Sequence, residues 1–270
     1  MLYAWKVRLL KVPWINRLWR RWRARRGDYV GDYGRLGEYI RNHAKGKSFA
    51  DIGCMWGVNG EYSFIAEEAG ATEIKALDVF GPTPEFERKK RDRNSKVEFI
   101  LGDATDPATI QRIGQVDVVF CAGVLYHHPS PFDLLVALRR MCRQTLILRT
   151  STIPEIKGLP NAAVYWPMLP ARGRGLWDLR RLGLLGQTGI TTEFDPSQGY
   201  GNWFWGLTPS CLHSLLQTAG FKTRWRFNEA FAQTFIAEAV DPPLAHKLPG
   251  EEESRRMAQE ISASGIARPA

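Results

Sequence analysis

Ser48-Phe-Ala-Asp-Ile-Gly-Cys-Met-Trp-Gly57 is the stretch of sequence that decides the fold. Its first half, Ser48–Ile52, is an apolar run of strand length, and two glycines follow within five residues. Because glycine has no Cβ atom, it lets the backbone turn tightly and approach a ligand closely. The stretch therefore predicts a buried strand that leads into a ligand-binding loop.

Strand and helix patterns alternate downstream of this loop as far as residue 150. Strands are expected at 73–77, 97–101, 116–121 and 145–149, and helices at 61–69, within 81–94, at 108–113 and at 131–142. This order is typical of a parallel, doubly wound α/β sheet. A helix over 208–219 and strands over 221–227 and 233–240 follow, and a short turn between these strands implies antiparallel pairing. We predict a Rossmann-like, mostly parallel seven-stranded sheet with an antiparallel last strand.

Three regions follow from these patterns. Residues 1–47 are expected to form a basic amphipathic helical arm and cap, with a short helix near 36–43. Residues 48–240 are expected to form the α/β domain, in which 151–206 is an insertion on the substrate side, rich in proline, glycine and aromatic residues. Residues 241–270 read as a polar tail.

The net charge of +9 is concentrated in the arm. Residues 1–27 hold nine basic side chains and no acidic one, whereas the rest of the chain holds 28 of each sign. Four tryptophans interleave with these charges: Trp5, Trp14, Trp19 and Trp22. The pattern suits a lid or partner-docking helix, a helix in a membrane interface, or an RNA-binding segment. A mitochondrial transit peptide is disfavoured because residues 1–47 contain no Ser or Thr.

The cysteine pattern and the hydropathy indicate a cytoplasmic protein, with membrane association through residues 1–26 as an alternative. The four cysteines are widely spaced and form no C-x-x-C pair, so we expect buried reduced thiols and no metal site. No run of about 18 apolar residues is present, and the N-terminus does not resemble a secretory signal.

Three strand ends carry residues suited to one nucleoside. Asp51, Gly53 and Gly57 belong to the loop after the first strand, and Asp78 ends the second, where a carboxylate can accept two hydrogen bonds from a ribose diol. The third strand ends in Gly102-Asp103-Ala104, where the carboxylate would accept from an adenine amino group and Ala104 would lie against the ring. NAD also fits such a pattern, but the loop lacks the G-x-G-x-x-G register.

The run from Phe49 to Arg149 resembles the class I S-adenosylmethionine-dependent methyltransferases. Within them, Gly123-Val-Leu-Tyr-His-His-Pro-Ser-Pro131 is similar to the wobble-uridine carboxymethyltransferases of tRNA and their relatives. Asn202-Trp-Phe-Trp-Gly-Leu-Thr-Pro-Ser210 and the following Leu-Leu-Gln-Thr-Ala-Gly-Phe221 extend the similarity. It covers roughly residues 48–150 and 200–240.

The resemblance implies S-adenosylmethionine as the cofactor. It places Asp51, Gly53 and Gly57 around the methionine part, Asp78 on the ribose, and Asp103 and Ala104 on the adenine. Met55 stands where the family loop has its middle glycine, so its side chain must turn aside or narrow the pocket. Met55 and Cys121, at the end of the fourth strand, complete the predicted cofactor-binding set.

Methyl transfer depends mainly on alignment, with a base needed for a hydroxyl or protonated amine acceptor. His127 or His128, just past the fourth strand, is the predicted base, and Tyr126 is predicted to hold the acceptor or the sulfonium face. A structural role, in which a histidine beside Pro129 caps the next helix, is the alternative. The insertion offers four aromatic side chains for the substrate, unless they are core residues: Tyr165, Trp166, Trp203 and Trp205.

The sequence favours methylation of a small molecule, a class that includes lipid-linked and secondary-metabolite acceptors. The alternatives are a tRNA-modifying methyltransferase and a non-catalytic cofactor-binding or membrane-adaptor protein. The electrically neutral body disfavours a large RNA partner. Ordinary methyl transfer is preferred to carboxymethyl transfer, because the last strand, Ala232-Gln-Thr-Phe-Ile236, offers no basic residue for an extra carboxylate.

Overall fold

The central feature of the computed structural model is one seven-stranded sheet. The structure describes residues 32–153, 155–176, 193–228 and 232–240, together with isolated positions near both ends of the chain. The first five strands are β1 (Ser48–Ile52), β2 (Glu73–Asp78), β3 (Glu98–Leu101), β4 (Val116–Ala122) and β5 (Cys142–Ser151). The last two strands of the sheet are β8 (Phe221–Asn228) and β9 (Ala232–Ala239).

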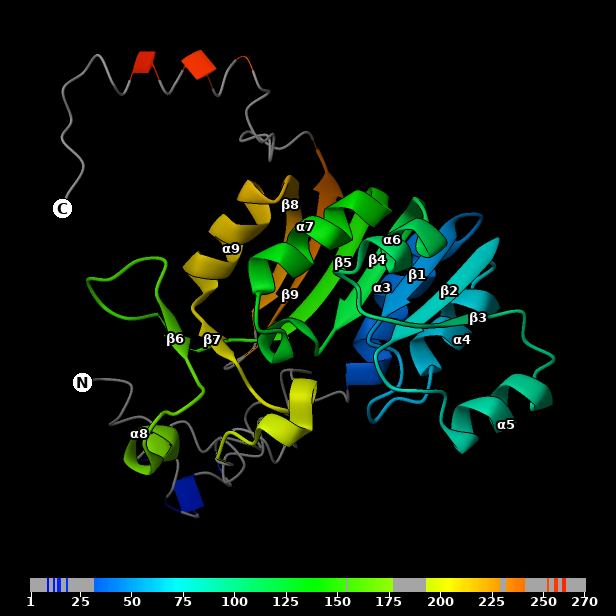
Figure 1. Cartoon of the computed structure of the whole chain (residues 1–270). Helices are drawn as coiled ribbons and strands as arrows, with labels where there is room; N and C mark the ends of the chain where they lie inside the picture. Colours follow the sequence, from blue (N-terminus) through cyan, green and yellow to red (C-terminus); the bar gives the residue numbers. More distant parts are fainter. Residues whose placement is uncertain are drawn as a thin grey trace.

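The strand order is β3-β2-β1-β4-β5-β9-β8 (Figure 1). Strands β1 to β5 pair in parallel, and β9 runs antiparallel to both β5 and β8. This is the predicted Rossmann-like sheet. The order reverses between β1 and β4, and ligands of open α/β sheets bind outside the carboxyl ends of the strands at such a switch point.

Helices cover both faces of the sheet. One face packs against α6 (Pro107–Ile113), α7 (Pro131–Met141) and α9 (Pro209–Thr218). The other packs against α3 (Asp32–Ala44), α4 (Glu61–Glu68) and α5 (Pro84–Asp92). Each face buries its own apolar cluster, so the central strands are covered on both sides, as parallel strands usually are.

Local capping signals explain where three of these helices begin. Helices α5, α6 and α9 each have proline at the first helical position, where its missing N–H is not needed. The preceding residues, Thr83, Asp106 and Thr208, accept a hydrogen bond from the backbone N–H three residues on. These starts lie within about three residues of the predicted ones.

The insertion contains more regular structure than its sequence indicates. Strands β6 (Ala163–Tyr165) and β7 (Trp205–Leu207) pair antiparallel as a separate two-stranded sheet. Helix α8 (Ala171–Leu176) and a 3-10 turn, η4 (Pro196–Gly201), lie between them in the chain. The hydrogen bond from Ile153 N to Leu207 O ties β7 to the end of β5, which brings the insertion back to the carboxyl edge of the main sheet.

Helix α3 belongs to the body of the domain. It packs against α4, and its side chains Leu36, Ile40 and Ala44 are buried in the core. The predicted boundary at residue 47 therefore separates two elements that pack together. The basic stretch 1–26 lies outside the described residues except for single positions, as do Glu229 and most of the predicted tail.

All four cysteines are buried, as predicted. Within the described ranges, no helix is long and apolar enough to cross a membrane. In the same part of the chain, no cluster of three or more His, Cys, Asp or Glu side chains is arranged to hold a metal ion.

Candidate active site

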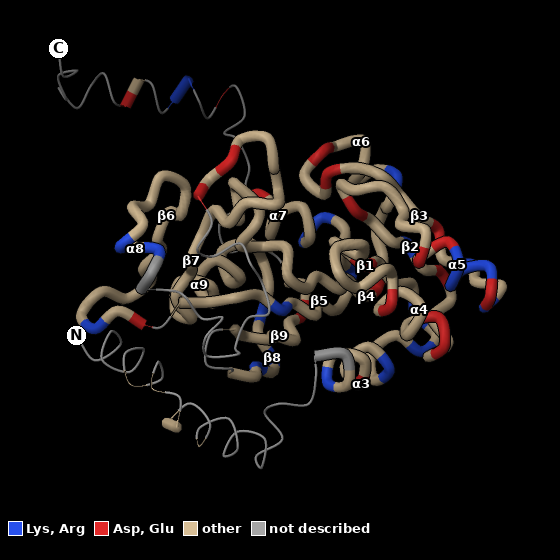
Figure 2. The backbone as a smooth tube through the Cα atoms, turned by 90° about the horizontal axis from the view of Figure 1, so that it is seen from below, with Lys and Arg blue, Asp and Glu red and all other residues tan. Residues whose placement is uncertain are grey.

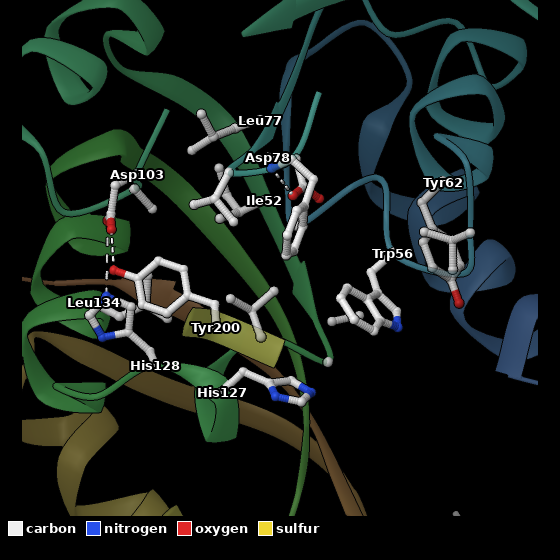
Figure 3. A pocket seen from close by; sticks show the side chains of 18 of the residues that line it. Ile52, Trp56, Tyr62, Leu77, Asp78, Asp103, His127, His128, Leu134 and Tyr200 are labelled. Carbon is white, nitrogen blue, oxygen red and sulfur yellow. Dashed lines mark hydrogen bonds and ion pairs between the residues drawn. The ribbon is translucent and has the colours of Figure 1, made fainter. Parts of the chain in front are cut away.

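A cavity of about 240 Å³ opens at the carboxyl ends of the parallel strands (Figure 3). Its walls come from the loops after β1, β2, β3 and β4, from α3 through Leu36, and from η4 through Tyr200 and Gly201. The volume is close to the lower end of the range for small-molecule sites. The sheet's switch point therefore carries a ligand-sized pocket, as the strand order implies.

Gly53 forms the floor of this cavity where β1 ends. Its φ is +84°, and a Cβ atom there would lie 2.2 Å from the Val124 side chain. A side chain is thus excluded both by conformation and by space. Because Gly53 N donates to Leu77 O, the loop is also fixed to the neighbouring strand β2. The predicted close approach of backbone and ligand is possible at this position.

Met55 turns away from the cavity. Its side chain is buried in the core against α4, and its backbone N donates to Asp78 Oδ2 at 2.7 Å. The sequence left open whether the Met55 side chain turns aside or narrows the pocket. In the structure it turns aside, and the pocket stays open. Gly57, at φ +73°, turns the chain near the start of α4 and does not line the cavity.

Asp78 presents its carboxylate to the cavity from the end of β2. Oδ2 accepts from Met55 N, and Oδ1 accepts from Phe80 N at 2.9 Å. These hydrogen bonds fix the orientation of the carboxylate, and each of its oxygens can still accept a second hydrogen bond. Burial raises the pKa of Asp78 above its ordinary value, and the backbone donors act in the opposite direction. This geometry suits the predicted contact with a ribose diol.

Asp51 lies beneath the loop rather than in the cavity. It is buried, and its Oδ2 accepts a hydrogen bond from Ser63 Oγ at 2.7 Å. Burial raises its pKa to about 7, with a further contribution from the nearby negative charge of Asp78. The residue therefore connects β1 to α4, and we predict that its role is in stability.

The raised pKa of Asp51 predicts a pH-dependent stability. The folded state keeps the proton up to about pH 7, whereas the unfolded chain loses it near pH 4. The free energy of unfolding should therefore fall as pH rises between these values, by up to about 4 kcal/mol. Asp51→Asn removes the titrating group and keeps the Ser63 contact. Urea unfolding from pH 4 to pH 8 should show a smaller decline in the variant, and equal slopes would contradict the assignment.

Asp103 is held in a hydrogen-bond network at the end of β3. Its Oδ1 accepts from the backbone N and the hydroxyl of Thr105, both at 2.7 Å, and its Oδ2 accepts from Tyr200 Oη. His128 Nε2 lies 3.9 Å from Oδ1, and the His128 ring stacks on Tyr200 (Figure 3). These hydrogen bonds hold the pKa of Asp103 below its ordinary value despite burial. Asp103 and Ala104 both line the cavity, and their contact with adenine stays a prediction.

His127 lines another part of the cavity with a defined tautomer. Its Nδ1 is 2.7 Å from the carbonyl oxygen of Asn202. A carbonyl only accepts, so Nδ1 carries the hydrogen and the lone pair lies on Nε2. Burial lowers the pKa of His127 to about 4, which keeps the ring neutral at physiological pH. A neutral imidazole with an available Nε2 is suited to accept a proton.

His128 and Tyr126, the other two predicted catalytic residues, occupy different surroundings from those of His127. His128 lies at the Asp103 end of the cavity, which favours a role in positioning that carboxylate. Tyr126 is buried behind His127, with ring centroids 4.2 Å apart, and does not line the cavity. The predicted contact of Tyr126 with the acceptor is thus absent from this arrangement, in which Tyr126 supports the His127 ring.

The predicted substrate aromatics do not line the cavity. Trp166 and Trp203 are buried and pack against each other, and Trp203 also contacts Tyr126. Tyr165 and Trp205 pack together on the small sheet, where Trp205 Nε1 donates to Pro129 O. These four side chains fix the insertion to the domain. Cys121 is likewise buried in the core below the cavity.

Several cavity-lining residues were not among the predicted site residues, and Tyr200, Leu36 and Arg149 are examples. Tyr200 comes from the irregular insertion and Leu36 from the helix before the α/β alternation begins. Arg149 lies near the carboxyl end of β5, paired with Thr234 of β9. The sequence of the last strand offers no basic residue that could hold an extra carboxylate. Arg149, on the neighbouring strand β5, is a basic residue that lines the cavity. The Gly-Tyr-Gly run at 199–201 was a usable signal, because glycines on both sides of an aromatic residue mark a tight turn that presents it.

Comparison with known proteins gives one matching family, described as Methyltransferase domain, over residues 50–148. A curated relative, the tRNA U34 carboxymethyltransferase of Pseudomonas syringae pv. tomato, is 33% identical over 117 residues. That alignment covers 41% of this chain and 34% of the relative, so the similarity spans about a third of the relative's length.

Solved structures share the fold at low sequence identity. The N-terminal domain of EvdMO1, crystallised in the presence of SAH and D-fucose, superposes with a TM-score of 0.53 at 16% identity, covering 78% of this chain and 84% of that one. A 1,6-didemethyltoxoflavin-N1-methyltransferase of Burkholderia thailandensis gives a TM-score of 0.51 at 16% identity, covering 80% and 87%.

The cavity fits S-adenosylmethionine in its donor and acceptor chemistry. Asp78 and Asp103 both offer carboxylate oxygens on the wall of one pocket, and Gly53 lines it without a side chain. Trp56 and Phe80, with ring centroids 5.3 Å apart, flank the pocket as an apolar rim, and Trp56 is 67% exposed. A nucleoside with a polar tail matches this alternation of acidic and apolar walls.

Proposed function

We propose that this chain transfers the methyl group of S-adenosylmethionine to a small-molecule acceptor, since residues 50–148 match the family described as Methyltransferase domain. The single observation that carries the proposal is His127, which lines the cofactor cavity as a neutral imidazole with Nε2 available. When bound, S-adenosylmethionine supplies a methyl group that its sulfonium charge activates.

His127 would remove the proton of the acceptor as the methyl group is transferred. Methyl transfer removes the positive charge of the sulfonium, and proton transfer places a positive charge on His127. The net charge of the cavity is therefore unchanged. Burial penalises a net gain of charge, and this exchange avoids it. The low pKa of the free imidazole is therefore compatible with a base role during transfer.

The enclosure of the site supports a small acceptor. η4 lies over one side of the cavity, and the hydrogen bond from Tyr200 to Asp103 holds it there. A large folded substrate would have to displace this segment to reach His127. Basic and acidic positions are interspersed along the described backbone (Figure 2). The chain outside residues 1–27 is neutral, which does not favour a polyanionic partner.

The direct test is cofactor binding. The wild-type chain should bind S-adenosylhomocysteine with a micromolar dissociation constant, as a largely preformed pocket allows, and should not bind NAD. Isothermal titration calorimetry measures both. Tight NAD binding without S-adenosylhomocysteine binding would refute the proposed function.

A second candidate is carboxymethyl transfer to tRNA, as the name of the curated relative suggests. Arg149 favours it, because this basic residue lines the cavity and a guanidinium can pair with a carboxylate on the transferred group. Calorimetry with a cofactor carboxylated on its methyl group separates the two candidates. Equal or weaker binding than that of S-adenosylmethionine supports methyl transfer, and binding more than tenfold tighter supports the alternative.

A further inference from the structure

A short segment of the insertion, Asp195–Trp203, borders the cofactor cavity through Tyr200 and Gly201, and we call it the strap. Its turn is built by Asn202, whose side chain accepts from Asp195 N and donates to the carbonyl oxygens of Asp195 and Gly199 at 2.7 and 2.9 Å. Asn202 is buried, so these hydrogen bonds are shielded from water. The strap is therefore a defined structure that presents the residues at its tip in one position.

Tyr200 is the residue that the strap presents to the cavity. Its hydroxyl donates to Asp103 Oδ2, and its ring stacks on His128 with centroids 5.3 Å apart and an angle of 27° between the planes. Burial and the Asp103 charge raise the pKa of Tyr200 above its ordinary value, so the hydroxyl stays a donor. Figure 3 shows the ring between Asp103 and the centre of the pocket.

The cavity that Tyr200 lines has apolar walls as well as the Asp103 carboxylate. Apolar side chains Ile52, Leu77 and Leu134 line it, together with Ala104. Asp103 Oδ2 accepts one hydrogen bond, from Tyr200, and retains one acceptor site. A flat apolar ring that carries an amino group at its edge therefore matches both the walls and the remaining acceptor.

We propose that Tyr200 is a cofactor-binding residue, contributed by the insertion, that forms one aromatic wall of the adenine site. One face of its ring rests on His128, and the other face meets the adenine. The inference rests on the proposed function, because it assumes S-adenosylmethionine as the ligand. In this proposal the strap contacts the cofactor through Tyr200, and it also borders the acceptor side of the pocket.

The test compares two variants with a control on the same strap. Tyr200→Ala removes the wall, and Tyr200→Phe keeps the ring but removes the hydroxyl. Gln198→Ala changes an exposed strap residue whose side chain donates a hydrogen bond to Asp195. The probes are S-adenosylhomocysteine and 5′-methylthioadenosine, which has the adenosine but lacks the amino-acid part. Calorimetry gives the dissociation constants, and thermal unfolding without ligand checks the fold.

Tyr200→Ala should weaken both probes by the same factor, roughly tenfold to a hundredfold, as the loss of an aromatic stacking partner for a base does. Tyr200→Phe should weaken both by a smaller factor and carries the test if the alanine variant does not fold. Gln198→Ala should bind as the wild type does.

Three results would overturn the inference while leaving the proposed function intact. These are unchanged affinity in folded Tyr200 variants, tighter binding in Tyr200→Ala, and a loss confined to S-adenosylhomocysteine, which would place Tyr200 at the amino-acid part. If the wild-type chain bound neither probe, the proposed function would fail together with this inference, so the two failures are distinguishable.

Discussion

Replacing Asp78 by alanine is expected to weaken the binding of S-adenosylhomocysteine by at least about a hundredfold. The reason is the loss of two charge-assisted hydrogen bonds to a ribose diol, each worth about 1.5–3 kcal/mol. Asp78 is only 5% exposed, so water does not replace these contacts well. Calorimetry on the wild type and the variant measures the effect.

Asp78 also orients the loop, which calls for a graded series of variants. The alanine variant leaves Met55 N and Phe80 N without their acceptor, whereas Asp78→Asn keeps one carbonyl oxygen and removes the charge. The asparagine variant should therefore fall between the wild type and alanine. Asp92→Ala, at the exposed end of α5, is the matched control for loss of one carboxylate and should bind normally. Unchanged binding by folded Asp78→Ala would place the ribose ligand elsewhere.

The pH dependence of cofactor binding follows from the same carboxylate. Burial raises the pKa of Asp78, so its proton returns at a higher pH than for an exposed aspartate. A protonated carboxyl group has lost the charge that strengthens its hydrogen bonds to the ribose. Affinity should thus fall as pH decreases toward the raised pKa, and Asp78→Asn should lack this decline.

The sheet and the first loop were predictable because their signals are local. The signals are strand β1, the glycine that follows it, and Asp78 at the end of the next strand. These elements follow one another along the chain and pair directly in the fold. Met55 shows the limit of this reasoning. Its departure from the family loop gave two possible outcomes, and only the packing against α4 decides that its side chain turns inward.

The far wall of the site was not predictable, because it depends on how the insertion returns to the sheet. Tyr200 and Asp103 are 97 positions apart, and no periodicity relates them. Trp166 and Trp203 illustrate the converse error. An aromatic residue in an irregular segment has the same sequence signature whether it faces a ligand or, as here, packs against other aromatic rings.

The sequence also could not distinguish the roles of the two histidines. His127 and His128 are adjacent, yet one bonds to the strap through Asn202 O and the other lies beside Asp103. The 3-10 turn η1 (Leu125–His127) ends between them, so their side chains diverge. This backbone geometry is the basis of our proposal that His127 faces the acceptor and His128 lies beside the adenine.

His127→Ala is expected to lower turnover by roughly 10²–10⁴-fold while S-adenosylhomocysteine affinity stays nearly unchanged, because a general base acts on the transition state. Small hydroxylated and amine acceptors, screened with a radiolabelled methyl donor, supply the assay. His213→Ala, which removes a histidine of α9 outside the cavity, is the matched control and should retain full turnover.

The pH profile then shows whether His127 acts as the base or only shapes the pocket. With a pKa of about 4, the free imidazole is ready to accept a proton at every pH well above that value. The wild-type kcat, measured at saturating cofactor so that the titration of Asp78 does not affect it, should therefore rise with pH through about 4 and be level near neutrality. In His127→Ala this limb should disappear, and turnover should instead rise with the acidity of the acceptor. A variant with lower turnover but the wild-type limb would assign the proton to another group and leave His127 a positioning residue, held by Asn202 beside the reacting atoms.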